Sequence, residues 1–518
     1  MTNNNFETME EILTPSIFCE NQANNYIKIT NSDYRKKKGQ FFTPPKIAKF
    51  MAEISYERGS QTLKILDPGA GAGILTCAIC ELMASKDNIK VIEVDAYEND
   101  TNLANYLQES FNFCQQWLNR FNIKFYYKII EKDFILDAIE KFRTNKFSTY
   151  DIIIGNPPYF KISKNNPQAQ EAIEFVYGQP NIYSLFMGVA VNLLNDDGQM
   201  VFITPRSYTT GPYFKAFRKI FFGKMKPERV HIFESRKDTF HKDSVLQENI
   251  ILKARKSNNS KNIEISLSTG INDIEKSPIH LAPLNHVLFQ RNGDILFRLP
   301  VDEQDDSILI KVDEWTGSLQ KFGMKISTGP VVPFRTTEFL SSSNIENCDQ
   351  LAPLLWMTNV YAMKVLWPKN GNNGNGKPQF IIENTQTCNR KLLVKDSNYV
   401  LLHRFSAKEQ HRRLTAAPLL KGKLKSEKIG IENHLNYIYR SDGTLTDTET
   451  LGLAAIFNSS LLDRYFRISN GNTQVSATEI RAMPLPSLTD ITEIGESLVK
   501  LSHTPTLEEL DKMVWSKV

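Results

Sequence analysis

Short apolar segments alternate with amphipathic ones between residues 60 and 255, and this rhythm constrains the fold more than any other feature of the chain. Strands that alternate with helices form parallel βαβ units. The pattern therefore predicts an α/β fold with a doubly wound, mostly parallel sheet. Strands are expected at 63–68, 90–98, 125–134, 151–156 and 199–205, helices at 72–84, 102–118 and 181–194, and a terminal hairpin at 229–235 and 249–255.

The chain has 518 residues, which is too long for one ordinary core and suits two or three domains. The alternating rhythm ends near the polar stretch KSNNSKN at 256–262, and irregular elements with glycine-asparagine loops follow. We therefore expect an N-terminal segment at 1–30, a doubly wound α/β domain at 31–265 and a mixed α+β domain at 266–518.

Composition narrows the possible functions. No apolar run approaches 18 residues and the start of the chain lacks a secretory pattern, so we expect a cytoplasmic protein with no membrane partner. The net charge of +4 and the pI near 8.5 permit a polyanionic partner without requiring one. Basic residues cluster at 35–38 and between Arg390 and Lys428, where phosphate contacts are expected.

A glycine loop, LDPGAGAGIL at 66–75, follows the first expected strand and opens a helix. Glycines there allow a tight turn and the close approach of a ligand beyond the strand ends. Glu98 ends the next strand and can accept hydrogen bonds from both hydroxyls of a ribose. Asp133 and Phe134 end the third, where they can take an exocyclic amine and stack an adenine. Together with Asp67, these residues indicate a cofactor that contains a nucleoside.

The segment DIIIGNPPYF at 151–160 runs from a strand into two consecutive prolines. The Asn156 side-chain oxygen and the Pro157 carbonyl can each accept one N–H of a planar amine, which frees the nitrogen lone pair for attack. The prolines hold the carbonyl direction because their φ is fixed near −65°. Tyr159 offers a flat face for stacking. This motif indicates a site that activates a planar nitrogen, and it resembles the NPPY motif of amino-group methyltransferases.

In this order the motifs resemble class I S-adenosyl-L-methionine-dependent methyltransferases. More narrowly, the chain resembles type II restriction-modification DNA adenine-N6 methyltransferases of the gamma, TaqI-like order. In that order the cofactor motifs come first, the catalytic motif second and the target-recognition domain last. The resemblance implies a site-specific enzyme that methylates N6 of an adenine flipped out of duplex DNA. It also implies a monomer whose functional, not physical, partner is a cognate restriction endonuclease.

The resemblance assigns the site residues, starting with GQFFTPPKIAKFM at 39–51, which is similar to the family's N-terminal cofactor motif. It implies that Asp67 faces the cationic methionine end and that Phe186 either packs on the cofactor adenine or belongs to the core. Phe240 is the candidate for a second ring around the flipped base. The implied cofactor residues are Thr43, Pro44, Asp67, Gly69, Ala70, Gly71, Glu98, Asp133, Phe134 and Phe186. The implied catalytic residues are Asn156, Pro157, Pro158, Tyr159 and Phe240.

Beyond residue 266 the resemblance is looser and points to a DNA target-recognition domain. Segments 325–335, 405–420, 433–439 and 456–486 are similar to recognition segments of these enzymes. Basic and amide side chains suit contacts to phosphates and base edges. The DNA-binding candidates are Arg335, Arg404, Arg412, Arg413, Asn472 and Gln474.

Two other methyltransferase classes remain as alternatives. Cytosine-N4 enzymes more often carry serine in place of Asn156, and glutamine-N5 protein methyltransferases share the NPPY motif but lack a large C-terminal domain. Cys77 and Cys80 have CxxC spacing but lie in an apolar helix, so we expect them in the core and expect no metal site.

Overall fold

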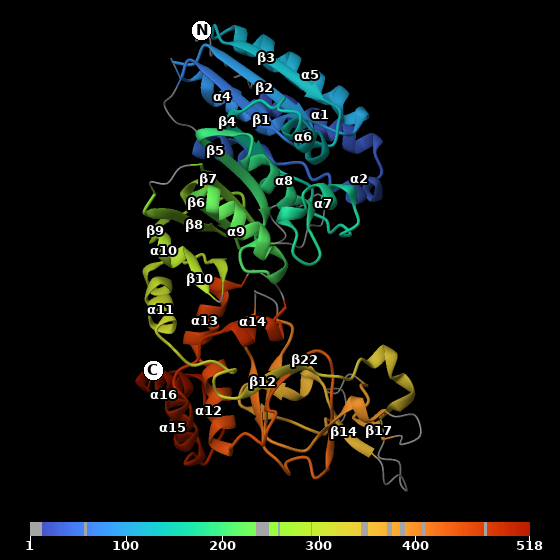
Figure 1. Ribbon diagram of the computed structural model, residues 1–518, viewed down its shortest axis with the longest axis vertical. Helices are drawn as coiled ribbons and strands as arrows, with labels where there is room; N and C mark the ends of the chain where they lie inside the picture. The colour runs from blue at the N-terminus through green and yellow to red at the C-terminus, as the bar shows by residue number, and fades with distance from the viewer. Residues whose placement is uncertain are drawn as a thin grey trace, which may run out of the picture. The chain divides into compact units, whose positions relative to one another are not determined.

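The computed structural model describes residues 13–55, 60–86, 88–234, 248–256, 260–291, 293–342, 351–369, 376–383, 389–406, 410–470 and 474–517. The chain divides into two compact units, Met1–Asp302 and Glu303–Val518, each a single continuous stretch (Figure 1). Among the residues described, no helix has both the length and the apolar character that a membrane span requires.

A nine-stranded sheet forms the centre of the first unit, in the order β3-β2-β1-β4-β5-β7-β6-β8-β9. Strands β3, β2, β1, β4 and β5 pair in parallel, whereas β7 is antiparallel to both β5 and β6. This confirms the predicted α/β class with a mostly parallel sheet. The strands are β1 (Thr62–Asp67), β2 (Val91–Tyr97), β3 (Lys124–Ile130), β4 (Tyr150–Gly155), β5 (Leu194–Pro205), β6 (Lys226–Phe233), β7 (Asn249–Arg255), β8 (Asn262–Ser268) and β9 (Ile279–Pro283), with a separate hairpin of β10 (Leu288–Arg291) and β11 (Asp294–Phe297).

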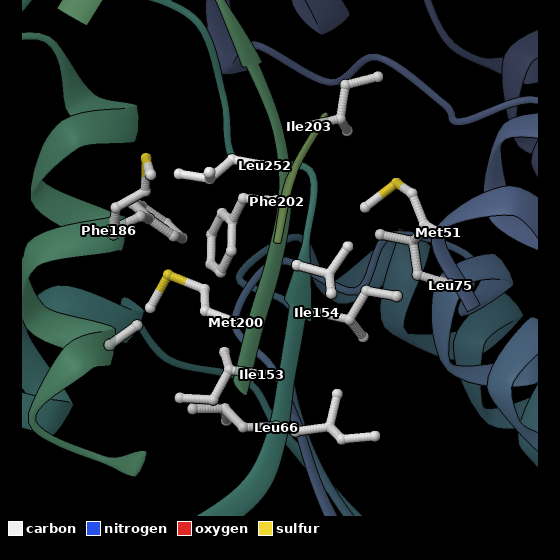
Figure 2. Packing of buried hydrophobic residues seen from close by; sticks show 14 of the residues in the cluster. Met51, Leu66, Leu75, Ile153, Ile154, Phe186, Met200, Phe202, Ile203 and Leu252 are labelled. Atoms are coloured by element: carbon white, nitrogen blue, oxygen red, sulfur yellow. The ribbon is translucent and has the colours of Figure 1, made fainter. Parts of the chain in front are cut away.

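Helices cover both faces of this sheet, as expected for a doubly wound fold. Side chains alternate between the two faces along each strand. Phe202 of β5 points toward Phe186 of α8, whereas Ile154 of β4 points to the other face, where Leu75 of α4 and Met51 of α3 lie (Figure 2). The helices are α1 (Pro15–Ile29), α2 (Ser32–Lys38), α3 (Pro45–Ser55), α4 (Ile74–Ala84), α5 (Thr101–Asn119), α6 (Phe134–Arg143), α7 (Pro167–Glu171), α8 (Ile182–Val191), α9 (Lys215–Lys224) and α10 (Leu284–Val287), with 3₁₀ turns η1 (Ile173–Phe175), η2 (Arg206–Tyr208), η3 (Pro212–Phe214) and η4 (Ile274–Lys276).

The third expected strand, 125–134, is shorter than its apolar pattern indicated. Strand β3 ends at Ile130, and Phe134 is already the first residue of α6. The Asp133 carboxylate accepts a hydrogen bond from the Leu136 amide at 3.0 Å and so caps this helix. Phe134 is therefore an apolar residue of the first turn of α6 and not of the strand.

The predicted hairpin, β6 and β7, is present but does not end the sheet. Strand β8 pairs in parallel with β6, and β9 pairs antiparallel with β8. The expected boundary at residue 265 cuts through β8, whose Ile263 and Ile265 are fully buried, and the first compact unit extends to Asp302 instead. The segment 1–30 is likewise no separate part, because Cys19 of α1 lies in the same core as the sheet.

The second unit has mixed α+β structure, as predicted. Its larger sheets have the orders β12-β22-β19-β20 and β13-β17-β14-β21-β18. The strands are β12 (Met324–Thr328), β13 (Leu340–Ser341), β14 (Leu351–Leu355), β15 (Val360–Tyr361), β16 (Lys364–Val365), β17 (Phe380–Ile382), β18 (Leu393–Lys395), β19 (Tyr399–His403), β20 (Ala416–Leu419), β21 (Lys428–Ile431) and β22 (Leu435–Arg440). The helices are α11 (Glu303–Asp313), α12 (Asp447–Asn458), α13 (Ser460–Ser469), α14 (Ala477–Ala482), α15 (Leu488–Val499) and α16 (Leu507–Lys517), with 3₁₀ turns η5 (Pro333–Arg335), η6 (Thr337–Phe339), η7 (Met357–Asn359) and η9 (Asn389–Leu392).

Candidate active site

An open pocket of about 860 Å³ lies at the carboxyl ends of β1, β2, β3 and β4. Ligands bind at this edge of doubly wound sheets. The pocket brings together residues that the sequence scatters over about 150 positions, from Lys37 of α2 to Phe186 of α8. Eight residues expected from the sequence line it: Gly69, Gly71, Glu98, Asp133, Phe134, Asn156, Pro158 and Phe186.

Glu98 lies at the end of β2 with its carboxylate at the pocket wall. One oxygen accepts a hydrogen bond from the Gly71 amide at 3.1 Å, and the other accepts from the Asp100 amide at 2.8 Å. Burial raises the pKa of Glu98 to about 7, and the negative charges of Asp100 and Asp67 add to that shift. The side chain is thus fixed in place and retains lone pairs for the hydroxyls of a ligand.

Asp67 is positioned differently from what the resemblance implied. Its side chain is fully buried and does not line the pocket; its oxygens accept hydrogen bonds from the Thr76 hydroxyl at 3.1 Å and the Gly69 amide at 3.4 Å. Burial raises the pKa of Asp67 to about 7, although these two hydrogen bonds oppose the shift. Asp67 therefore stabilises the glycine loop from the side of the core and does not face the pocket.

Aromatic rings form the side of the pocket beside Asp133. The rings of Phe134 and Phe186 lie 5.2 Å apart at an angle of 39°. Phe186 is 7% exposed, so the helical residue contributes both to the core and to the pocket wall. The side-chain amide of Gln168, on α7, donates to Asp133 and also lines the pocket. This side can hold a flat ring that carries an amine.

The N-terminal segment folds across the pocket and touches both motifs. Gly39 ends α2 with φ of 66°, and a Cβ built there would lie 2.6 Å from Pro158 Cβ, so only glycine permits this close approach. Phe42 covers the glycine loop, because a Cβ on Gly71 would lie 3.7 Å from its ring. The cofactor loop and NPPY are thus closed over by residues 39–42.

Asp100 holds this segment in place. One of its oxygens accepts hydrogen bonds from the hydroxyls of Tyr26 and Tyr34, both at 2.9 Å, and from Gln40 at 3.2 Å. The other caps α5 by accepting from the Asn102 and Leu103 amides. Burial acts to raise the pKa of Asp100, but the hydrogen bonds from Tyr34, Tyr26 and Gln40 outweigh it, so the pKa lies below its usual value.

The carboxamide of Asn156 has every polar atom engaged. Its Nδ2 donates to the Phe41 carbonyl and to Thr43 Oγ1, each at 3.0 Å. Its Oδ1 accepts from the Tyr159 hydroxyl at 2.5 Å. The glycine loop lies close by, since a Cβ on Gly69 would be 4.0 Å from the Asn156 carbonyl oxygen.

Tyr159 does not present the open stacking face that the sequence led us to expect. It is 9% exposed, its hydroxyl lies 3.0 Å from the Ile203 carbonyl, and its ring stacks on Phe41 at a centroid distance of 5.8 Å. Burial raises the pKa of Tyr159 well above its usual value, so the phenol stays protonated. Stacking on a substrate would require the ring to move.

The remaining expected residues of the first unit fall outside the pocket lining. Thr43, Pro44, Ala70 and Pro157 are close in sequence to lining residues but do not line it themselves. Phe240 lies outside the described residues. The expected core positions of Cys77 and Cys80 are confirmed, since both are fully buried in α4.

In the second unit the DNA-binding candidates separate into exposed and internal residues. Arg413 is fully buried, and its Nε donates to Ser406 at 2.9 Å. Arg412 pairs with Asp511 at 3.6 Å and also bonds the Asn458 carbonyl, so both arginines hold this unit together instead of facing a partner. Arg404 is half-buried and donates to the Asn433 carbonyl, whereas Arg335 and Gln474 are exposed; Asn472 lies outside the described residues.

Sequence reasoning missed several pocket residues. Lys37, Lys38, Gln40 and Phe42 line the pocket, and so does Gln168. Asp100 had a usable signal, because an aspartate before a helical run is a typical N-cap. Lys37 and Lys38 belong to the basic cluster at 35–38, and Gln40 and Phe42 belong to the motif at 39–51, so the sequence singled out their segments but not the individual residues. Gln168 had no local signal, since its position depends on contacts between distant segments.

The chain is similar in sequence to restriction-modification methyltransferases. Residues 47–240 match the family model described as Eco57I restriction-modification methylase. The type II methyltransferase M.PstI of Providencia stuartii is 33% identical over 466 residues, which cover 90% of each chain. The type II methyltransferase M.BsuBI of Bacillus subtilis is 33% identical over 481 residues, which cover 91% of this chain and 92% of that relative.

A solved structure supports the same fold. The type IIL restriction-modification enzyme MmeI, determined in complex with DNA, aligns with a TM-score of 0.55 and 12% identity. The alignment covers 98% of this chain and 79% of that one. At this identity the likeness establishes the fold alone.

Proposed function

Because the chain belongs to the type II DNA methyltransferases of restriction-modification systems, we propose that it methylates the exocyclic N6 of an adenine extruded from duplex DNA. We further propose that it acts as a monomer and protects its sites against a cognate restriction endonuclease. The observation that carries the proposal is Asn156 at the end of β4, whose amide orientation turns Nδ2 to Phe41 and Thr43 and Oδ1, the acceptor, toward Tyr159.

The pocket fits S-adenosylmethionine, the cofactor of this family. Glu98 can accept from the ribose hydroxyls, Asp133 from an adenine amine, and Phe134 and Phe186 supply apolar walls for the ring. Gly69 and Gly71 have no side chain, so the backbone there can approach the cofactor closely. When bound, the cofactor supplies an electrophilic methyl group on a sulfonium.

The chain's own groups would prepare the amine. In adenine the N6 lone pair is delocalised into the ring, so the nitrogen is a weak nucleophile. Asn156 Oδ1 and the Pro157 carbonyl can each accept one N–H, which favours a pyramidal nitrogen whose lone pair is free. In the free enzyme Oδ1 already accepts from Tyr159, so that hydrogen bond must give way first.

Extrusion of the base follows from the position of these acceptors. An amine inside a duplex cannot reach a carbonyl at the edge of a sheet, and flipping costs a few kcal/mol. The second unit would supply sequence recognition, with Arg335 and Gln474 as the exposed candidates among the residues expected to contact DNA.

The deciding experiment identifies the methylated base. DNA treated with the enzyme and labelled S-adenosylmethionine is digested to nucleosides and separated by mass spectrometry. We expect N6-methyladenine; N4-methylcytosine would establish the cytosine alternative, and label in protein but not DNA would favour the glutamine alternative. Asn156→Ala should lower turnover by orders of magnitude with DNA binding nearly intact.

Flipping is tested separately with 2-aminopurine at the target position. Its fluorescence should rise when either the wild-type enzyme or the Asn156→Ala variant binds. An active, bound wild-type enzyme with no change in fluorescence would contradict the flipping mechanism.

A further inference from the structure

The two N–H groups of the Asn156 carboxamide are held by two different kinds of acceptor. One is the Phe41 carbonyl and the other is Thr43 Oγ1, each 3.0 Å from Nδ2. Thr43 is 6% exposed, so this contact is shielded from water. Phe41 belongs to the segment 39–42 that closes over the pocket and Thr43 follows it directly, so both acceptors lie more than 110 residues before Asn156 in the chain.

The Phe41 carbonyl determines which way the amide points, and the Thr43 hydroxyl holds that orientation with a second hydrogen bond. A backbone carbonyl can only accept, so the NH₂ end must face Phe41, and Thr43 takes the second N–H. If the amide were rotated by 180°, Oδ1 would lie against the Phe41 carbonyl and both N–H groups would lose their partners. With the observed orientation, Oδ1 faces Tyr159.

We propose that Thr43 is a positioning residue, which holds the Asn156 amide so that its oxygen and not its NH₂ group meets the target amine. The inference rests on the function proposed above and adds a residue to it. It differs from the role that the family resemblance implied for Thr43, a contact with the cofactor, because Thr43 does not line the pocket.

Three roles of Thr43 can be told apart by measurement: orienting Asn156, contacting the cofactor and stabilising the fold. A residue that orients Asn156 acts only when the amine is polarised, so its removal lowers kcat and leaves binding of cofactor and DNA unchanged. A residue that contacts the cofactor changes the dissociation constant of S-adenosylmethionine. A residue that merely stabilises the fold changes the melting temperature, with little effect on kcat of the folded fraction.

The first test compares Thr43→Val with Thr43→Ser. Valine has the same shape but leaves one N–H of Asn156 without a partner, and we expect kcat to fall about tenfold or more in single-turnover methyl transfer. Serine keeps the hydroxyl and should restore kcat to within about threefold of wild type. Thr450→Val, at a fully buried threonine of α12 in the second unit, is the matched control and should leave kcat unchanged. If Thr43→Val folds poorly, Thr43→Ala is measured instead.

The second test asks whether Thr43 acts through Asn156. In an Asn156→Ser background there is no amide to orient, so adding Thr43→Val should cause no further fall in kcat. Multiplicative reductions in the double variant would overturn the proposal, and so would an unchanged kcat in Thr43→Val or a reduction confined to cofactor affinity. A wild-type enzyme that forms no N6-methyladenine would instead refute the proposed function, so the two failures are distinct.

Discussion

The hydroxyl of Tyr159 donates a hydrogen bond to Asn156 Oδ1 at 2.5 Å, so the free enzyme occupies the acceptor that its proposed substrate needs. The same hydroxyl lies 3.0 Å from the Ile203 carbonyl, which offers it another partner when the acceptor is taken. The ring rests on Phe41, whose carbonyl holds the other end of the amide. Asn156, Phe41 and Tyr159 therefore form one connected unit.

Methyl transfer should not require the hydroxyl of Tyr159, but it should require the aromatic ring. Tyr159→Phe removes the competing O–H and keeps the ring, so we expect single-turnover methyl transfer within about threefold of wild type. Tyr159→Ala removes the ring that rests on Phe41 and that would stack on the flipped base once it moves, a contact worth about 1–3 kcal/mol per base. Transfer should therefore fall roughly 10- to 100-fold, with altered 2-aminopurine fluorescence. Equal reductions in the two variants would mean that the hydroxyl acts during transfer.

Cofactor affinity should depend on pH through Glu98. Its pKa lies near 7 because it is buried, and only the ionised form accepts from both ribose hydroxyls. As the pH falls from 8 to 6 the carboxylate gains a proton, so the dissociation constant of S-adenosylmethionine should rise up to about tenfold in calorimetry. For folding the sign is the reverse: the raised pKa favours the neutral form, so stability from this group declines as pH rises from 4.5 toward 7.

Glu98→Gln is the matching control for this dependence. It should bind the cofactor more weakly at pH 8, by roughly one to three kcal/mol, and with a flat profile between pH 6 and 8. A profile as steep as that of wild type would assign the titration to another group, for which Asp67, with its pKa also near 7, is the candidate.

Lys37 and Lys38 should contribute to DNA affinity. Both are exposed on α2 and line the rim of the pocket, within reach of phosphates beside an extruded nucleotide. The logarithm of the DNA association constant should fall with the logarithm of salt concentration. Replacing both lysines by glutamine should reduce that slope by about 0.9 for each phosphate that is no longer neutralised.

The control replaces Lys90 and Lys124, two exposed lysines beside the amino ends of β2 and β3, at the edge of the sheet away from the pocket. Their replacement by glutamine should leave the slope unchanged. Equal effects of the two pairs would show that the lysines act only through net charge.

The position of the domain boundary can be tested with two fragments. A fragment of residues 1–302 should melt cooperatively and bind S-adenosylmethionine within about threefold of the full chain, yet lose site-specific methylation. A fragment of residues 1–265 lacks part of β8 and all of β9, so it should be less stable. Retained sequence specificity in the longer fragment would contradict the assignment of recognition to the second unit.

The parts of the site that the sequence predicted share one property: each follows directly from a local pattern. The glycine loop, Glu98, Asp133 and Asn156 all come at the end of an apolar strand, and parallel strands bring their carboxyl ends to one edge of a sheet. Knowing the strands was therefore enough to bring these residues together.

The parts that escaped prediction depend on contacts between distant segments. Tyr26 reaches Asp100 across 74 positions, and Asn156 reaches Thr43 across 113. Arg413 looked like a surface residue because it is basic, but it is fully buried between Ser406 and the ring of Phe466. Local sequence cannot say whether a strand-end carboxylate such as Asp67 turns toward a ligand or back into the fold.

The chain divides into its two compact units at Asp302–Glu303, and each unit is one continuous stretch of sequence. A gene that encodes such a chain can exchange its entire second half through a single recombination breakpoint. Such an exchange leaves every strand of the nine-stranded sheet and every residue that lines the pocket in the retained half. For the engineer, codon 302 is the place to join halves from different relatives.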